Sequence, residues 1–278
     1  MTDGPAISSR HNPRFKAALA LRDARERRER RRFLVDGARE IARALDAGLH
    51  VSEAWVAPDR VRSDAARALL PRLPAAGAEI VEVPAELLAR LAYGERDEGV
   101  VVVVEEPPAS LDALALPERP LVAVVERVEK PGNLGAVLRS ADGAGVDAVI
   151  VADPVTDLWN PNAIRASLGT IFGLPIAACS SADALRFLRD RGVGVVAARV
   201  DGVLDYSAVD LGGAVAIVVG SEAAGLSEAW RGSDITSVRI PMLGLADSLN
   251  VAATAAVLFF EARRQRRAAT RQVNQEES

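Results

Sequence analysis

The fold is indicated most clearly by the stretch Gly132-Asn133-Leu134-Gly135-Ala136-Val137-Leu138-Arg139-Ser140-Ala141-Asp142. The apolar run 121–125 precedes it and indicates a buried strand. A polar turn follows this run, and then a helix begins that carries Arg139 in its first turns. Because α/β proteins bind their ligands in the crevice at the carboxyl ends of the strands, we expect Arg139 to point into such a crevice.

Two later segments repeat this order of apolar run and polar cluster. They are Gly220-Ser221-Glu222-Ala223-Ala224-Gly225 and Ser248-Leu249-Asn250. Each has a plain structural interpretation: a turn with an exposed glutamate for the first, and a helix N-cap at Ser248 for the second. The stretch 132–142 could likewise be a capped helix with a solvated arginine. Three such segments in one half of the chain suggest a single composite site.

Strands and helices alternate through the second half of the chain. Apolar runs predict strands at 121–126, 148–152, 175–178, 193–198, 214–219 and 237–240. Helices fall between most of them, and a long final helix is expected from about Ser248 to Arg267. This alternation favours a mostly parallel sheet covered on both faces, and therefore an α/β fold class.

The first half predicts a smaller α/β domain. Helices are expected at 14–31, 36–47, 65–73 and 85–91, and strands at 51–56, 79–83 and 100–104. The proline-rich interval 106–118 follows and is interpreted as a linker. We therefore expect domains at 10–105 and 119–267, with flexible tails at 1–9 and 268–278.

The composition is that of an ordinary globular protein. The chain has 278 residues, 49% of them hydrophobic and 26% charged, which allows two domains. No apolar run reaches the ~18 residues of a membrane span, and no secretory signal is visible. The single cysteine excludes an internal disulfide, and His11 and His50 fit no metal-ligand pattern. We therefore expect a cytoplasmic protein without a metal site.

Charge is distributed unevenly along the chain. The net charge of −4 argues against a nucleic-acid partner. However, ten Lys or Arg residues stand against three acids between Arg10 and Arg32, and a second basic cluster occupies 263–267. Basic patches, rather than net charge, are typical of nucleic-acid binders. On charge alone, the first cluster is either an RNA-binding face or a solvated helix. The usual dinucleotide, P-loop and hydrolase-elbow motifs are absent.

The polar segments resemble the three motifs of the SpoU/TrmH family of RNA ribose 2′-O-methyltransferases, of the SPOUT class. The matching residues are Asn133-x-Gly135-x-x-x-Arg139, then Gly220-Ser221-Glu222-x-x-Gly225-Leu226-Ser227, and finally Ile240-Pro241-Met242 with Ser248-Leu249-Asn250-Val251. Asn12-Pro13 and the run 31–37 are similar to the family's small RNA-binding domain. The resemblance covers about 10–267 and is greatest to ribosomal-RNA methyltransferases of the avilamycin-resistance type.

The resemblance implies a parallel α/β domain with a deep trefoil knot, joined to a ribosomal-protein-like RNA-binding domain. It implies S-adenosylmethionine as cofactor, held by Gly220, Ile240, Met242 and Leu249. It also implies a catalytic group of Arg139, Asn133, Glu222, Ser248 and Asn250. A guanidinium is essentially never neutral, so we assign Arg139 to holding the adjacent phosphate rather than to accepting the proton.

The resemblance also implies an RNA partner and a dimeric state. Phosphate contacts are expected from Arg14, Lys16, Arg22, Arg27, Arg28 and Arg31. The resemblance implies a homodimer. Small alanines at 252–256 are compatible with close approach of another helix to the final helix, and equally with ordinary core packing within one chain. The expected substrate is 23S ribosomal RNA. The alternatives are a tRNA ribose methyltransferase and a non-catalytic RNA-binding protein of the same fold.

Overall fold

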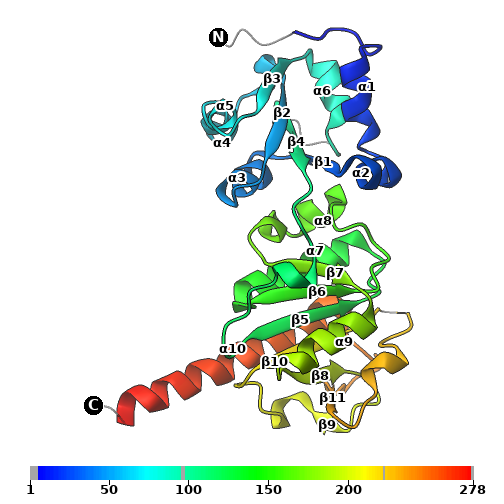
Figure 1. Ribbon diagram of the computed structural model, residues 1–278, viewed down its shortest axis with the longest axis vertical. Helices are drawn as coiled ribbons and strands as arrows, with labels where there is room; N and C mark the ends of the chain where they lie inside the picture. The colour runs from blue at the N-terminus through cyan, green and yellow to red at the C-terminus, as the bar shows by residue number, and fades with distance from the viewer. Residues whose placement is uncertain (1–5, 95–97, 222, 277–278) are drawn as a thin grey trace. The chain divides into compact units, whose positions relative to one another are not determined.

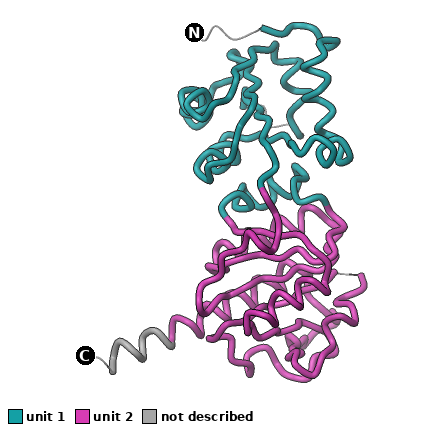
Figure 2. The backbone as a smooth tube through the Cα atoms, in the orientation of Figure 1, with its two compact units in different colours: residues 1–107, 157–173 teal, residues 108–156, 174–278 magenta. Residues whose placement is uncertain are grey.

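The computed structural model describes residues 6–94, 98–221 and 223–276, with side chains as far as residue 268. The chain divides into two compact units (Figure 2). The first is Met1–Pro107 with Asp157–Gly173, and the second is Pro108–Thr156 with Leu174–Ser278. The division after Pro107 falls inside the expected linker. The segment 157–173, which we had expected in the second domain, groups with the first unit.

The first unit contains a four-stranded sheet (Figure 1). Its strand order is β1 (Arg32–Asp36), β4 (Val100–Glu105), β2 (Val51–Val56) and β3 (Glu79–Glu82). β4 is antiparallel to both of its neighbours, and β2 is parallel to β3. The valines of β4 are all buried, as expected for a central strand. β1 was not predicted, although four of its five residues are buried.

Two short helices replace the single helix predicted at 14–31. α1 (Pro13–Ala20) is capped by the Asn12 side chain, and α2 (Ala24–Arg30) by Asp23, which accepts two backbone N–H groups. An aspartate that caps a second helix is one reason for the first helix to end before it. The other helices of residues 1–107 are α3 (Ala38–Asp46), α4 (Asp64–Leu69), α5 (Arg72–Ala75) and α6 (Ala85–Leu91).

The segment 157–173 supplies part of the first unit's core. It contains α8 (Pro161–Ala166) and a 3₁₀ turn at Thr170–Phe172. The ring of Phe33 in β1 stacks on Trp159 and Phe172, with centroids 4.8 and 6.2 Å apart. The Arg165 guanidinium also donates to the Tyr93 carbonyl. These contacts make the segment integral to the first unit.

The second unit is built on a seven-stranded sheet. In sheet order the strands are β7 (Ile176–Cys179), β6 (Ala148–Ala152), β5 (Leu121–Glu126), β10 (Val215–Val219), β8 (Gly194–Ala198), β11 (Ile235–Arg239) and β9 (Leu204–Asp205). All neighbouring strands are parallel. The predicted α/β class and six of these strands are confirmed, with ends shifted by one or two residues. The trefoil knot stays a prediction.

Helices cover this sheet on both faces. α7 (Pro131–Ala144) and α10 (Val251–Glu276) pack against each other, and α9 (Ser181–Asp190) packs against β6 and β8 (Figure 1). The α9 side of the core contains Val122, Val124 and Trp230, all buried. Since side chains alternate along a strand, Ala123 and Val125 face the opposite side. No helix in the described part of the chain is both long and apolar enough to cross a membrane.

The interval expected to be a linker is partly packed into the second unit. It contains a 3₁₀ turn at Leu111–Ala113. Leu114 is buried in the core on the α9 side, and the Ala109 carbonyl accepts a 2.9 Å hydrogen bond from the Ala178 N–H beside β7. Residues 108–114 are therefore a structured part of the second unit.

Candidate functional site

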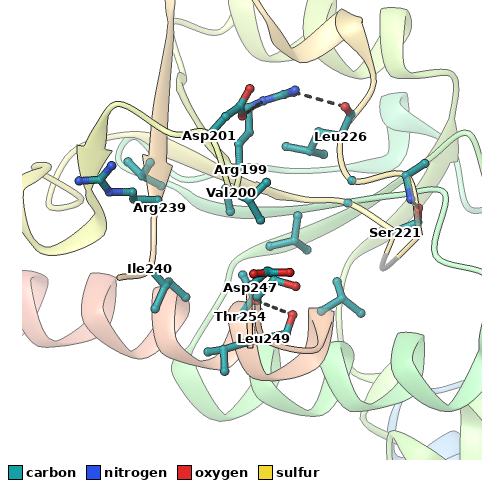
Figure 3. Close-up of a pocket in the computed structure, with 18 of the residues that line it drawn as sticks. Arg199, Val200, Asp201, Ser221, Leu226, Arg239, Ile240, Asp247, Leu249 and Thr254 are labelled. Carbon is teal, nitrogen blue, oxygen red and sulfur yellow. Dashed lines mark hydrogen bonds and ion pairs between the residues drawn. The ribbon is translucent and has the colours of Figure 1, made fainter. Parts of the chain in front are cut away.

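A cavity of about 440 Å³ lies within the second unit, at the carboxyl ends of β8, β10 and β11 (Figure 3). The segment 247–251 and the first turns of α10 close its remaining side. This is the edge of a parallel sheet at which α/β proteins bind ligands. All four residues predicted to hold a cofactor line the cavity: Gly220, Ile240, Met242 and Leu249.

The segment after β10 folds back tightly on Gly220. A Cβ atom on Gly220 would lie 2.5 Å from the Gly225 carbonyl carbon and 2.7 Å from the Leu226 nitrogen, so only glycine fits. The Ser221 carbonyl accepts the Gly225 N–H at 2.9 Å, and its hydroxyl accepts the Ala224 N–H at 3.1 Å. Backbone groups of this segment therefore form one wall of the cavity.

The third polar segment differs from the prediction at the start of α10. Asn250, not Ser248, caps the helix: its Oδ1 accepts the Ala252 N–H at 2.8 Å, and its carbonyl accepts the Thr254 N–H at 2.9 Å. The expectation of Ser248 as N-cap and helix start near 248 is therefore wrong. The Asn250 side chain is exposed. Ser248 instead lines the cavity.

The first polar segment meets the third through two asparagines. The Asn250 side-chain amide donates to Oδ1 of Asn133, at 3.5 Å. Asn133 lies in the first turn of α7, which begins at Pro131 with Pro at an N-terminal position. α7 and α10 are packed together, so this contact is supported by the helices beneath it. The structure thus brings Asn133 and Asn250, two residues of the predicted composite site, into contact.

Arg139 lies two turns further along α7 and is exposed. Among the described residues, its guanidinium has no hydrogen-bond or ion-pair partner. Most arginines of the second unit are held by carboxylates or carbonyls, as in the pairs Arg186–Asp183 and Arg189–Asp234. An exposed and unengaged guanidinium is available to a phosphate. Glu222, the fifth predicted catalytic residue, lies outside the described residues.

A charged cluster at the cavity was missed by sequence reasoning. Arg199, Asp201 and Arg231 line the cavity, with Asp201 bridging the two arginines at 3.0 and 2.6 Å. Hydrogen bonds from Arg231 and Arg199 lower the pKa of Asp201 to about 2. Arg199 also donates to the Leu226 carbonyl at 3.3 Å (Figure 3). Arg199 and Asp201 are two positions apart, but Arg231 lies 30 positions from Asp201, so no local pattern indicates the whole cluster.

Three predicted RNA contacts in the first unit are engaged within the protein. Arg14 donates to Glu53 and Glu79. Arg22 donates to the carbonyls of Arg90 and Ala92, and Arg27 is 4% exposed and ion-paired with Asp157 at 2.6 Å. A buried guanidinium cannot reach a phosphate, so Arg27 is corrected to a structural residue.

The other three predicted contacts lie on the surface. Lys16, Arg28 and Arg31 are exposed. Lys16 and Arg28 have no partner among the described residues, and Arg31 is 3.9 Å from Glu106. These cations remain available to an anionic ligand. In the second basic cluster, by contrast, Arg266 donates to the carbonyls of Arg119, Pro120, Leu211 and Gly213, so this residue fastens α10 to the sheet.

Comparison with known proteins matches both halves of the chain. The family model described as SpoU rRNA Methylase family matches residues 120–260, and the model of an MRM3-like substrate binding domain matches 12–102. The chain is 36% identical over 270 residues to a 23S rRNA (uridine(2479)-2′-O)-methyltransferase of Streptomyces viridochromogenes, covering 94% of this chain and 92% of that protein.

Two solved structures have the same architecture over nearly the whole chain. The SpoU methyltransferase AviRb of Streptomyces viridochromogenes in complex with AdoMet has a TM-score of 0.85 and 33% identity, covering 92% of this chain and 98% of that one. An RNA 2′-O ribose methyltransferase has a TM-score of 0.81 and 39% identity, covering 94% and 99%. With the second and third polar segments lining one cavity and its family model matched over residues 120–260, this chain belongs to the SpoU rRNA methylase family.

Proposed function

We propose that this protein methylates a ribose 2′-hydroxyl of 23S ribosomal RNA, with S-adenosylmethionine as methyl donor. The observation that carries the proposal is the Asn250–Asn133 contact, which joins the third polar segment, at the cavity, to the first. The family membership supports the reaction, and the 23S rRNA methyltransferase of Streptomyces viridochromogenes, as a relative, supports the substrate. The AdoMet complex of the AviRb structure supports the cofactor.

The cavity fits this cofactor in size and chemistry. Its volume of about 440 Å³ lies within the ~300–1,000 Å³ of small-molecule sites. The apolar side chains of Ile240, Met242 and Leu249 suit the faces of a base and the aliphatic carbons of the cofactor, and backbone groups of 220–221 and 223–226 suit polar edges. Asp247 lines the same cavity and supplies a carboxylate for an amino group. When bound, the cofactor supplies an activated methyl group.

The chain's own residues then orient the nucleotide. Arg139 holds the phosphate beside the reacting ribose and stabilises the negative charge that develops on the 2′-oxygen. It is not the proton acceptor, because a guanidinium stays charged. Asn133, Ser248 and Asn250, with Glu222, orient the ribose and the arginine. Alignment of the hydroxyl with the methyl group supplies much of the rate. No metal ion takes part in this proposal.

The RNA substrate is gripped by the first unit, through Lys16, Arg28 and Arg31. These side chains are exposed. Ribosomal RNA as substrate also supports a cytoplasmic location. Release of counterions from the RNA makes such a grip weaken steeply with salt.

We further propose a homodimer. Large apolar side chains are exposed on the second unit: Phe260 is 52% exposed on α10, and Leu243 and Leu245 are fully exposed in the segment before it. Exposed apolar patches of this kind mark protein interfaces. Light scattering at micromolar concentration should give twice the mass of the chain, and a monomer mass would contradict the dimer.

The experiment for the activity uses the full-length protein, labelled S-adenosylmethionine, and purified 23S ribosomal RNA or transfer RNA. Both RNAs are purified from cells that lack the gene. Label is expected in their ribosomal RNA, at the nucleotide whose 2′-O-methyl group these cells do not form. Label in transfer RNA alone would replace the substrate with the tRNA alternative. Binding of RNA without any transfer would support the non-catalytic alternative.

A further inference from the structure

Glu126 is the last residue of β5 and is completely buried in the second unit. Its carboxylate accepts four hydrogen bonds. The donors are the hydroxyls of Ser181 and Ser227 at 2.7 and 2.6 Å, the Ser227 backbone N–H at 2.7 Å and the Trp230 indole N–H at 2.9 Å. Burying a carboxylate is costly unless hydrogen bonds replace its water. Four neutral donors at one carboxylate therefore indicate a specific function for the acid.

Three of these four bonds come from Ser227 and Trp230, which follow the cavity-lining residues Gly220 to Leu226 along the chain. Ser227 directly follows Leu226, the last residue of the fold-back that begins at Gly220. Trp230 ends the 3₁₀ turn Glu228–Trp230 and is buried beside α9. Glu126 thus fastens the distal end of this segment to the carboxyl end of β5. The proximal end is fixed already, because Gly220 directly follows β10.

A second anchor holds the same segment from β8. Arg199, which directly follows β8, donates to the Leu226 carbonyl at 3.3 Å, and Asp201 pairs with Arg231 at 2.6 Å. Residues 226 to 231 are therefore held on both sides, by Glu126 and by the Arg199–Asp201 pair. Between them and Gly220 lies the tight fold-back whose backbone lines the cavity.

We propose that Glu126 is a positioning residue for cofactor binding, which acts by holding Ser227 and Trp230 so that Gly220, Ser221 and residues 223–226 keep their places in the cavity lining. Glu126 does not line the cavity. The inference rests on the proposed function, because it takes S-adenosylmethionine as the occupant. It predicts that loss of the anchor loosens cofactor binding, and leaves RNA binding by the first unit unchanged.

Glu126→Gln is the sharpest substitution, since it keeps the size of the side chain. One carboxylate oxygen, Oε1, receives three donors, and Oε2 receives the Ser227 N–H. If the amide oxygen takes the Oε1 position, the amide NH₂ faces the Ser227 N–H. If the amide is turned round, the NH₂ faces the Trp230 indole N–H. In either orientation the amide NH₂ faces another N–H donor, and two donors cannot hydrogen-bond to each other. At least one of the bonds that hold Ser227 and Trp230 is therefore lost.

Ser181→Ala is the matched control. The Ser181 hydroxyl lies 2.7 Å from Glu126 and 2.7 Å from Asp153, and its one hydrogen serves only one of these acids at a time. Ser181 begins α9 and does not belong to the cavity wall. This variant removes a bond to Glu126 and leaves the bonds to Ser227 and Trp230 intact.

The experiment measures S-adenosylmethionine affinity by calorimetry, RNA affinity by filter binding, and the thermal midpoint. We expect Glu126→Gln to weaken S-adenosylmethionine binding by about tenfold or more, with kcat at saturating cofactor within about threefold of wild type. RNA affinity should be unchanged. Ser181→Ala should bind the cofactor as wild type does. A purely structural function would instead lower the thermal midpoint in both variants without a selective loss of cofactor affinity.

Trp230→Phe and Ser227→Ala keep the inference testable if Glu126→Gln does not fold. Each removes one donor to Glu126, and each should weaken cofactor binding more than Ser181→Ala does. Equal affinities in all these variants would overturn the inference. Failure of the wild-type protein to bind S-adenosylmethionine would instead overturn the proposed function, so the two failures are distinguishable.

Discussion

The Asn250 side-chain amide donates to the Asn133 Oδ1 at 3.5 Å, and joins two residues that are 117 positions apart. Each asparagine lies at the N-terminal end of a helix, Asn133 in the first turn of α7 and Asn250 at the cap of α10. Helix N-termini attract anions through their unpaired N–H groups and their dipoles. The contact therefore brings two such ends together at the edge of the cofactor cavity.

Asn133 and Asn250 are predicted to act as a unit in catalysis. Residues in contact show coupling energies of about 0.5–3 kcal/mol in double-mutant cycles. We expect the Asn133→Ala and Asn250→Ala single variants each to lower kcat/KM, and the double variant to lose less than the product of the two losses. The cycle is measured by methyl transfer to ribosomal RNA. Strict additivity would mean that the two amides act independently.

Arg139→Ala is predicted to lower kcat by about 10²–10³ while leaving the fold intact. The guanidinium is exposed and unengaged within the described residues, so its loss should change stability by no more than about 0.5 kcal/mol. Removal of a group that stabilises developing negative charge costs about 10²–10³ in kcat. Single-turnover methyl transfer and S-adenosylmethionine binding are the measurements.

Arg186→Ala is the matched control for Arg139. Arg186 is also an exposed arginine of the second unit, but it lies on α9 and pairs with Asp183. It should retain wild-type activity. Full activity in Arg139→Ala would remove this residue from the catalytic group.

Gly220→Ala is predicted to displace the cavity wall and so to weaken cofactor binding. The added Cβ would overlap the backbone of Gly225 and Leu226 at 2.5–2.7 Å, and the fold-back can relieve this only by moving. Overpacking of this kind costs about 1–3 kcal/mol, which is about 5–150-fold if it falls on cofactor affinity. Gly213→Ala is the control, because its Cβ would meet nothing within 4 Å. Equal cofactor affinity in the two variants would contradict the assignment of Gly220.

The sequence predicted the parallel sheet well because its strands are continuous apolar runs. Val122 to Val125 and Val215 to Val219 are buried throughout, and such runs are typical of strands covered on both faces. The four residues predicted to bind the cofactor all line one cavity, but that prediction came only through the family resemblance. Their spacing alone would not have placed Ile240 and Leu249 in one cavity.

Other features depend on partners that are remote in sequence. The Arg14–Glu79 pair spans 65 positions and Arg27–Asp157 spans 130, so a count of basic residues could not separate structural arginines from available ones. The turn at residues 21–23 was missed because arginine and glutamate favour helix on both sides of it, although Asp23 is a typical cap. Glu126 was missed because only the folded chain surrounds it with donors.

Arg27 and Arg28 are neighbours with predicted opposite functions. Arg28→Ala should reduce RNA affinity and lower the slope of log affinity against log salt by about 1, since one phosphate contact is lost. Its stability should be unchanged, because the side chain is exposed. Lys16→Ala should behave in the same way. Filter binding at several salt concentrations is the measurement.

Arg27→Ala should instead destabilise the first unit. Asp157 would keep its charge in a site where its side chain is 12% exposed, and removal of one partner of a buried pair costs about 3–5 kcal/mol. The variant should therefore unfold at lower urea concentration. A loss of RNA affinity in Arg27→Ala at unchanged stability would reverse the assignments of the two residues.

Cys179 is predicted to be unreactive in the folded protein near neutral pH. Burial, reinforced by Asp183 and Asp153, raises the pKa of this thiol to about 11 from 9.0, and the reactive species is the thiolate. Between these two pH values the unfolded chain has lost the proton that the folded chain keeps. The unfolded state thus binds fewer protons, and the contribution of Cys179 to stability falls as pH rises from about 9 to about 11.

Alkylation with iodoacetamide at pH 8 tests this prediction cleanly, since Cys179 is the single cysteine of the chain. The folded protein should react much more slowly than protein unfolded in guanidinium chloride, which serves as the control. The rate should rise with pH well beyond 9, because the thiolate fraction follows the raised pKa. A folded protein that reacts at pH 8 as fast as the unfolded one would show that β7 leaves the thiol open to solvent, against the partly buried position it has at the end of that strand.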